Sequence, residues 1–283
     1  MKTPLAFLAG LLALSSAALA QNRLAYGANI GWIDFAPDAG ASVHVGENFL
    51  SGDAHSANCG WIHFGDTPDN GVSYANIRPP DIGVNHDGCG TLSGFAYGAN
   101  IGWINFGWTA DNSDPNRPWF DLTTGQFHGF AYSANCGWIN LGAGYLAIDR
   151  IEHPDADGDG IDDIWEHKWF GDLTTAGVGT DADGDGQSDA AEYAADTDPL
   201  QASDFLRIVS HSYANGHTEV TLVFTTQPSR LYQLQHSTDL VTWSDSGLGT
   251  FAPDPDGKTT RTFSFSGTAR HFFRACAVLP LTP

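Results

Sequence analysis

Two twelve-residue segments in the middle of the chain carry acidic residues at alternate positions. They read DADGDGIDDIWE at 155–166 and DADGDGQSDAAE at 181–192, with Asp at positions one, three, five and nine, Gly at six and Glu at twelve. A hard divalent cation needs several oxygen ligands at once, and alternate side chains of a tight loop can supply them. Glycine at position six permits the turn, position seven offers its main-chain carbonyl, and the final glutamate can contribute both oxygens. Each segment is therefore predicted to be an EF-hand-like metal-binding loop.

Both loops are expected to bind Ca²⁺, which gives two sites. Calcium is favoured over magnesium because all the ligands are protein oxygens and their number is large. One such segment alone could be an acidic surface turn, but two copies in register, each followed by helix-forming residues, favour cation binding. The candidate ligands are Asp155, Asp157, Asp159, Ile161, Asp163 and Glu166 in the first loop and Asp181, Asp183, Asp185, Gln187, Asp189 and Glu192 in the second.

Residues 155–199 resemble the bacterial thrombospondin type 3 and dockerin-like calcium repeats, through the two loops and the trailing EYAADTDP at 192–199. The resemblance implies a structural role, in which calcium stiffens a spacer or docking module and no reaction follows. Many such proteins carry Gly-Thr-Asp-Pro after the second helix. This chain keeps the final Thr-Asp-Pro but lacks the glycine, which argues against a ligand role for Asp196 or Asp198.

Short helices are expected to follow each loop and to position its last ligands. Trp165 and Trp169 lie one helical turn apart, and Gly171 is the expected end of the first helix. Tyr193 belongs to a similar apolar stripe in the second helix, before Pro199 ends the segment. We expect the two tryptophans to pack between the helices. The calcium segment is predicted to span residues 150–204.

A fourfold repeat precedes the calcium segment. The copies read LAYGANIGWIDF at 24–35, DAHSANCGWIHF at 53–64, FAYGANIGWINF at 95–106 and FAYSANCGWINL at 130–141. Each predicts two short strands around a tight turn, because the shared Ala-Asn-(Ile/Cys)-Gly tolerates left-handed backbone and the residues from tryptophan onward alternate in polarity. We expect an all-β repeat domain at 21–149. The copies resemble the Gly-Trp-Ile-Asn-Phe repeats of exported bacterial surface proteins, which implies a location only.

The repeat tryptophans Trp32, Trp61, Trp103 and Trp138 admit two interpretations. Strand alternation puts Ile33 and Phe35 on one face of the first copy, with Trp32 and Asp34 on the other. A tryptophan beside a short polar side chain, four times over, could form a row of sugar-binding platforms. The alternative, which the sequence favours, is that the tryptophans fill the core of the repeat and donate their indole N–H groups to the turns.

The remainder of the chain, residues 205–283, alternates like short strands and predicts a β-sandwich. Strands are expected near 219–224, 231–235, 261–265 and 272–278. The segments RLYQLQHSTDLVTW at 230–243 and RHFFRACAVLP at 270–280 resemble C-terminal modules of many exported bacterial proteins, which implies an accessory role. The predicted fold class is mainly β: a β repeat domain, a short α calcium segment and a C-terminal β-sandwich.

Residues 1–20 are typical of a secretory signal peptide. Lys2 provides the positive start, residues 5–14 the apolar core, and Ala18-Leu19-Ala20 a small-residue cleavage site. A retained N-terminal anchor is the alternative. No later stretch has the apolar length of a membrane span, so we expect a mature protein that is secreted, extracellular or at the cell surface.

Charge and cysteine content narrow the function further. The formal net charge is −21, and 15 of the 33 acidic residues lie between 155 and 204, where Lys168 is the only lysine or arginine. Such a chain is a poor nucleic-acid binder, because phosphate contacts require basic residues. The four cysteines, Cys59, Cys89, Cys136 and Cys276, allow three disulfide pairings, between which the sequence does not choose. The absence of a Cys-x-x-Cys motif argues against structural zinc.

No catalytic motif is present: no Gly-x-Ser-x-Gly, His-Glu-x-x-His, phosphate-binding glycine loop or dinucleotide fingerprint. The sequence therefore predicts a non-enzymatic, calcium-binding structural or interaction protein, in which calcium makes the joint between two β domains rigid. A carbohydrate-binding or adhesive module that uses the repeat tryptophans is a second hypothesis, with a glycan or another surface protein as partner. A secreted hydrolase with an unrecognised site is the third.

Overall fold

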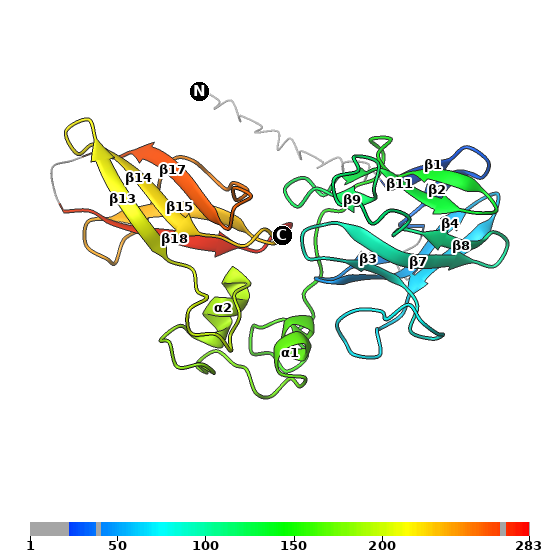
Figure 1. The fold of residues 1–283 in the computed structure, drawn as a ribbon, viewed down its shortest axis with the longest axis horizontal. Helices are drawn as coiled ribbons and strands as arrows, with labels where there is room; N and C mark the ends of the chain where they lie inside the picture. Colours follow the sequence, from blue (N-terminus) through cyan, green and yellow to red (C-terminus); the bar gives the residue numbers. More distant parts are fainter. Residues whose placement is uncertain (1–22, 38–40, 267–269, 283) are drawn as a thin grey trace, which may run out of the picture.

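The computed structural model describes residues 23–37, 41–266 and 270–282. Within these residues the chain is mainly β, as the sequence predicts, with strands on either side of two short helices (Figure 1). The expected signal peptide at 1–20 lies outside the described residues. Figure 1 shows the repeat region at one end of the molecule, the C-terminal strands at the other, and α1 and α2 between them.

The four repeats form four antiparallel hairpins that close into a barrel. The hairpins are β1 (Leu24–Gly27) with β2 (Gly31–Asp34), β4 (Phe49–Ser56) with β5 (Gly60–Gly65), β7 (Leu92–Gly98) with β8 (Gly102–Asn105), and β11 (Phe130–Ser133) with β12 (Gly137–Asn140). Neighbouring hairpins pair through β2–β4, β5–β7, β8–β11 and β12–β1, so each copy contributes a quarter of the ring. The four repeats in the sequence therefore give the barrel approximate fourfold symmetry.

Shorter strands extend the barrel. β3 (Val43–Val45) pairs with β4, and β6 (Val84–His86) pairs with β4 and β7, while β9 (Trp119–Phe120) and β10 (Phe127–His128) pair with each other.

Equivalent residues of the four copies fill the barrel interior in layers. Alternation along each strand points every second side chain inward. The isoleucines that follow the repeat tryptophans are 1–2% exposed, and the alanines of the facing strands are 0% exposed. These inward residues are Ile33, Ile62, Ile104 and Ile139 with Ala25, Ala54, Ala96 and Ala131, and below them Phe35, Phe64, Phe106 and Leu141.

A ring of asparagine hydrogen bonds joins the hairpin turns at one end of the barrel. Each turn asparagine donates its Nδ2 to a main-chain carbonyl in the turn of the preceding copy. The bonds are Asn29 to Cys136, Asn58 to Ile30, Asn100 to Cys59 and Asn135 to Ile101, at 3.0, 3.0, 3.1 and 2.9 Å. The circle is closed, because the first copy donates to the fourth. This contact explains why every copy contains Ala-Asn-(Ile/Cys)-Gly.

The helices that follow the loops are α1 (Asp163–Trp169) and α2 (Asp189–Ala195). Asp162 and Ser188 cap their N-termini through their side chains, and α2 ends where Asp196 adopts a left-handed conformation with φ of 53°. The second helix therefore ends at Ala195, four residues before Pro199. Trp165 packs between the helices as expected, since it is 1% exposed and its ring lies 5.7 Å from that of Tyr193. Trp169 is partly buried against the same cluster.

The C-terminal region consists of two three-stranded sheets that enclose one hydrophobic cluster. One contains β13 (Ile208–Ala214), β14 (Glu219–Thr225) and β17 (Lys258–Ser264), and the other contains β16 (Ser244–Asp245), β15 (Leu231–Ser237) and β18 (Phe272–Val278). The shared cluster is Val220, Leu222, Phe224, Tyr232, Leu234, Phe263 and Phe265. We call this region the C-terminal sheets.

All four cysteines are free thiols within the described residues, so none of the three possible pairings forms a disulfide. Cys59 and Cys136 are buried at the barrel turns. Among the described residues, neither helix has the length or apolar composition needed to span a bilayer.

Candidate calcium loops and the joint around them

The first three carboxylates of each loop lie together. One ligand atom from each of Asp155, Asp157 and Asp159 lies within 4.8 Å of the others, and the second loop repeats this grouping. Main-chain N–H groups shape the loop: Gly158 and Gly160 donate to the two oxygens of Asp155 at 2.7 and 3.0 Å. Gly160 has φ of 90°, which explains the glycine at position six.

The second loop has the same local structure as the first. Gly184 and Gly186 donate to the two oxygens of Asp181 at 2.8 and 3.0 Å, and Gly186 has φ of 95°. The aspartates at position nine also match, since Asp163 accepts from the N–H of residue 156 at 2.8 Å and Asp189 from that of residue 182 at 3.0 Å. The positions that the two loops share thus make matching hydrogen bonds in both.

The glutamates at position twelve are buried although they carry acidic side chains. Glu166 on α1 is 0% exposed and Glu192 on α2 is 1% exposed. Both carboxylate oxygens of each are buried and have no hydrogen-bond partner among the described residues. Unpaired oxygens with the same burial occur on Asp159, Asp183, Asp185 and Asp189. Burying an unpaired charge is strongly unfavourable, so these oxygens fit a site whose cation supplies the missing partner.

The surroundings of these glutamates disfavour the ionised form in the absence of a cation. Burial, and then the negative charges of Asp159, Asp157 and other loop aspartates, raise the pKa of Glu166 to about 7. The same causes raise the pKa of Glu192 to about 8. A cation held between the aspartates and the glutamate would favour the ionised carboxylate. A donor set made only of oxygens suits a hard ion such as Ca²⁺.

The position-seven residues have different side-chain environments, which matches a role for the main chain only. Ile161 is 1% exposed and packs in the cluster with Trp165, whereas Gln187 is exposed. The N–H of Ile161 donates to Asp159 at 2.9 Å, and that of Gln187 donates to Asp185 at 2.7 Å. The structure groups the first three aspartates of each loop. Asp163 and Asp189 accept from main-chain N–H groups of their loops, and Glu166 and Glu192 lie close enough for the loop aspartates to raise their pKa.

Asp196 and Asp198 make contacts outside the loops. Asp196 accepts a hydrogen bond from the Ser229 hydroxyl and lies 3.6 Å from the Lys168 ammonium. Asp198 accepts from the main-chain N–H of Leu200 at 3.0 Å. Both carboxylates thus have protein partners.

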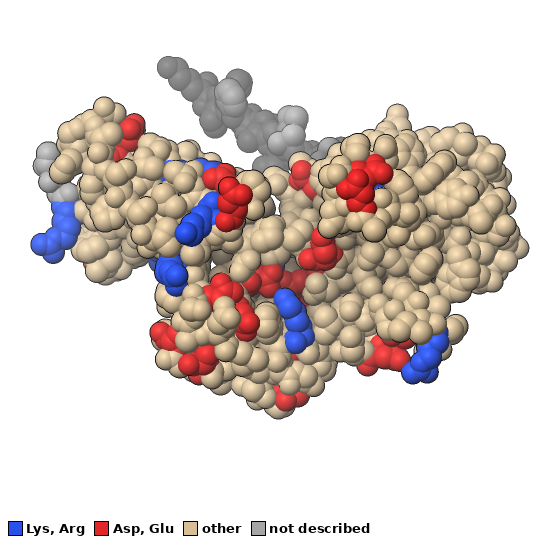
Figure 2. Space-filling view, in the orientation of Figure 1, with Lys and Arg blue, Asp and Glu red and all other residues tan. Residues whose placement is uncertain are grey.

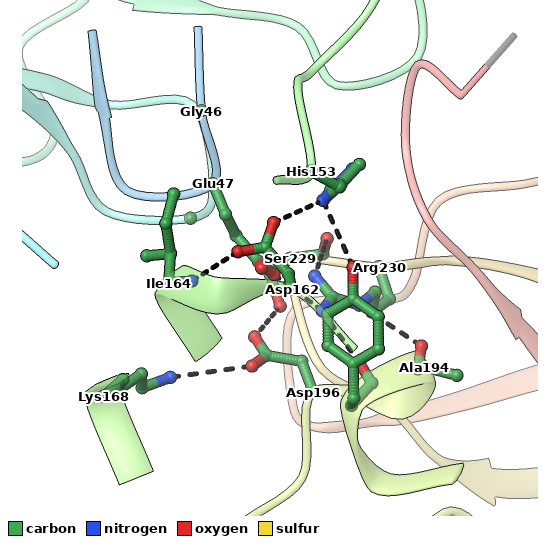
Figure 3. Close-up of polar contacts among 12 residues, drawn as sticks. Gly46, Glu47, His153, Asp162, Ile164, Lys168, Ala194, Asp196, Ser229 and Arg230 are labelled. Atoms are coloured by element: carbon green, nitrogen blue, oxygen red, sulfur yellow. Dashed lines mark hydrogen bonds and ion pairs between the residues drawn. The ribbon is translucent and has the colours of Figure 1, made fainter. Parts of the chain in front are cut away.

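Arg230 joins the barrel, α2 and the C-terminal sheets. Its guanidinium donates to Glu47 at 2.7 Å and to the main-chain oxygens of Tyr193 at 2.9 Å and Ala194 at 3.2 Å (Figure 3). Glu47 lies in the turn between β3 and β4, and Arg230 is 1% exposed. Burial raises the pKa of Glu47, and the charges of Glu47 and Asp196 raise that of Arg230 despite burial.

A second polar contact lies beside this pair. His153 Nδ1 lies 3.0 Å from Asp162, the residue that caps α1, and 3.3 Å from the Tyr193 hydroxyl (Figure 3). Ligand atoms of Glu47, His153 and Asp162 lie within 4.8 Å of one another. Because Asp162 already accepts from His153 and from the N–H of Ile164, and Arg230 pairs with Glu47, we interpret this group as a hydrogen-bonded network. We call it, with Tyr193 and Asp196, the joint network.

Sequence reasoning missed the joint network. Glu47 and Arg230 are 183 residues apart, and no local pattern marks either as a partner of the other. The one available signal is that Glu47 is the only glutamate between residues 21 and 149.

The prediction that the repeat tryptophans fill the barrel core is wrong. Trp32, Trp61, Trp103 and Trp138 are 47, 49, 46 and 49% exposed. The interior is filled by the alanine, isoleucine and phenylalanine layers, so alternation directs each tryptophan outward.

Comparisons with protein-family models, with curated proteins and with solved structures give no match to this chain. The candidate function therefore depends on the loops, the joint network and the outer surface of the barrel.

Proposed function

We propose that the protein is a calcium-binding structural or interaction protein, in which two Ca²⁺ ions make the segment between the barrel and the C-terminal sheets rigid. The observation that supports this most is the pair of buried glutamates, Glu166 and Glu192, whose carboxylate oxygens have no partner among the described residues. Their repetition in two loops that share several hydrogen bonds favours a common ligand over an accident of packing.

Each ion would connect a loop to the helix that follows it. In the first loop the aspartates at positions one, three, five and nine, the main-chain oxygen of residue 161 and Glu166 would hold the ion; the second loop offers the equivalent set ending in Glu192. A bound ion supplies positive charge and a cross-link between groups that otherwise repel one another. Acidic side chains gather over this part of the molecule in Figure 2.

The helices would transmit this order to the joint network. Glu192 directly precedes Tyr193, whose main-chain oxygen accepts from Arg230, and α1 begins at Asp162, which contacts His153. Fixing Glu192 therefore fixes the carbonyl groups that hold Arg230. The expected consequence is a rigid joint with calcium and a looser one without it.

Calorimetry of the purified mature protein tests calcium binding. We expect the wild-type protein to bind two Ca²⁺ ions and to melt at a higher temperature with calcium than with EDTA. The double variant Asp159→Ala, Asp185→Ala should lose most of the binding heat and most of the calcium-dependent rise in Tm, because it removes a central ligand from each loop. Asp256→Ala, an exposed aspartate in a turn of the C-terminal sheets, is the matched control. Equal heats and melting temperatures for the double variant and the wild type would refute calcium binding by these loops.

The expected signal peptide supports a secreted, extracellular or cell-surface location, where free calcium is abundant enough for low-affinity sites. In that setting the barrel would make contacts with a partner and the C-terminal sheets would serve as an accessory module. No catalytic role is proposed.

A further inference from the structure

The outer surface of the barrel carries four equivalent aromatic pairs. Each repeat tryptophan faces an aromatic ring directly across its hairpin. The pairs are Tyr26–Trp32, His55–Trp61, Tyr97–Trp103 and Tyr132–Trp138, with ring centroids 4.9, 4.9, 4.8 and 4.8 Å apart. Since each hairpin forms a quarter of the closed barrel, the pairs are distributed around its whole circumference.

A short polar side chain separates each pair from the next. Where two hairpins meet, the Tyr or His of an aromatic pair lies in register with a polar residue of the neighbouring hairpin. These contacts are Asp34 with His55, His63 with Tyr97, Asn105 with Tyr132 and Asn140 with Tyr26. The pairs and the polar residues therefore form one continuous ring around the barrel, which we call the aromatic belt.

Core packing does not account for the belt. Its tryptophans are 46–49% exposed. Exposing four tryptophans in equivalent places leaves apolar surface in water, which soluble proteins restrict to sites of contact. The belt thus combines partly exposed aromatic rings with polar side chains at regular intervals.

We infer that the aromatic belt binds neutral polysaccharide. The C–H face of a sugar ring stacks on an indole ring, while its hydroxyl groups exchange hydrogen bonds with amide, imidazole or indole groups beside it. Apart from Leu24, the belt strands direct only aromatic or polar side chains outward at these positions, and large parts of the barrel surface in Figure 2 carry no charged side chain. Aromatic rings beside hydrogen-bonding side chains suit the apolar faces and hydroxyl groups of sugars.

The acidic charge of the barrel region favours neutral over anionic polysaccharides. Residues 21–149 contain 12 acidic and three basic residues, so a chain of uronic acids or sulfated sugars would be repelled. The pairs face different directions around a closed barrel, and one short oligosaccharide cannot reach them all. The belt therefore suits a polysaccharide network that contacts several pairs at once, where multivalency strengthens weak single contacts. None of its residues belongs to the calcium loops, so binding does not depend on calcium.

Retention on insoluble polysaccharides tests the belt. The full mature protein is incubated, with calcium and with EDTA, on cellulose, chitin, β-1,3-glucan and starch, and on covalently cross-linked alginate beads as the anionic comparison. We expect retention on at least one neutral polysaccharide in both buffers and none on alginate. The quadruple variant Trp32→Ala, Trp61→Ala, Trp103→Ala, Trp138→Ala should lower the apparent affinity by about 100-fold or more, and each single variant by less. Tyr213→Ala, which removes an exposed ring from the C-terminal sheets, should not change it.

The inference would be overturned if no neutral polysaccharide retained the protein, or if retention were unchanged in all four single variants. It would also be overturned if the belt instead mediated association with neutral lipid vesicles or with a second copy of the chain. Circular dichroism and Tm establish whether each variant folds. If the quadruple variant does not fold, the single variants decide. Because retention is also measured in EDTA, a failure of polysaccharide binding can be distinguished from a failure of calcium binding.

Discussion

Arg230 is the side chain through which the barrel, α2 and the C-terminal sheets contact one another. Arg230 is 1% exposed. Its ion pair with Glu47 is also buried, since the side chains of Arg230 and Glu47 are 2% and 9% exposed. A buried pair contributes little compared with apolar side chains of the same volume, but loss of one partner leaves an uncompensated charge. The residues of this contact should therefore be sensitive to single substitutions and tolerant of paired ones.

Replacing Arg230 with methionine tests this asymmetry. We expect Arg230→Met to lower the free energy of unfolding by about 3 kcal/mol, because Glu47 stays buried without its cation. The double variant Arg230→Met, Glu47→Leu should recover a large part of that loss. Urea unfolding in calcium-containing buffer measures both.

The control for this experiment is Arg150→Met, which removes an exposed arginine that lies 3.4 Å from Glu152. An exposed pair of this kind contributes about 0–1 kcal/mol. If Arg230→Met costs no more than Arg150→Met, the joint network does not connect the three regions as described.

The acidic residues of the two loops and the Glu47–Arg230 pair differ in how far the sequence could predict their contacts. The proposed loop ligands are close in sequence, and a tight turn converts their spacing into proximity, so the grouping of the first three aspartates in each loop was predictable. Glu47 and Arg230 meet only because the whole chain folds back on itself. No local periodicity encodes such a contact.

The hairpins of the barrel show two solutions to the same packing problem. In the first copy Ile30 fills the turn and Gly27 leaves room for it, because a Cβ on Gly27 would lie 2.7 Å from Ile30 Cγ1. In the second copy the smaller Cys59 occupies the turn, and Ser56 takes the place of glycine and donates to the Ile30 carbonyl at 3.2 Å. The third and fourth copies repeat these two solutions, so Gly with Ile and Ser with Cys are matched sets.

Exchanging one matched set for the other tests this compensation. Gly27→Ser alone should lower the free energy of unfolding by about 1–3 kcal/mol through overpacking. The double variant Gly27→Ser, Ile30→Cys should be more stable than Gly27→Ser, since it reproduces the arrangement of the second copy. Thermal unfolding of the wild type and both variants provides the comparison, and an equal or lower Tm for the double variant would contradict the matched sets.

Strand positions were predictable, whereas the direction of the tryptophans was not. Alternation within GWIDF separates Trp32 from Ile33 and Phe35, and the structure confirms this separation. Alternation does not say which face is inside. The size and apolar character of tryptophan favour the core, but a narrow barrel has room for layers of alanine, isoleucine and phenylalanine. Closure into a ring, which depends on pairing between β2 and β4, sets that limit.

The molecule as a whole has its two β regions at opposite ends, with the acidic segment between them (Figure 1). Besides Arg230, the C-terminal tail connects the ends: the Ile151 N–H donates to the Leu281 carbonyl at 3.3 Å, and Leu281 packs against the barrel core cluster. If calcium orders the helices that support the joint network, the distance between the ends should vary less with calcium than without it.

Distances between spin labels on the two β regions test the role of calcium most directly. Labels at Ile77→Cys on the barrel and Val241→Cys on the C-terminal sheets occupy positions that are 84% and 83% exposed, in a background with Cys89→Ser and Cys276→Ser. Pulsed electron paramagnetic resonance should give a narrow distance distribution with calcium, a broad one after EDTA, and a narrow one again when calcium is restored. A distribution of the same width in calcium and in EDTA would contradict a calcium-dependent joint.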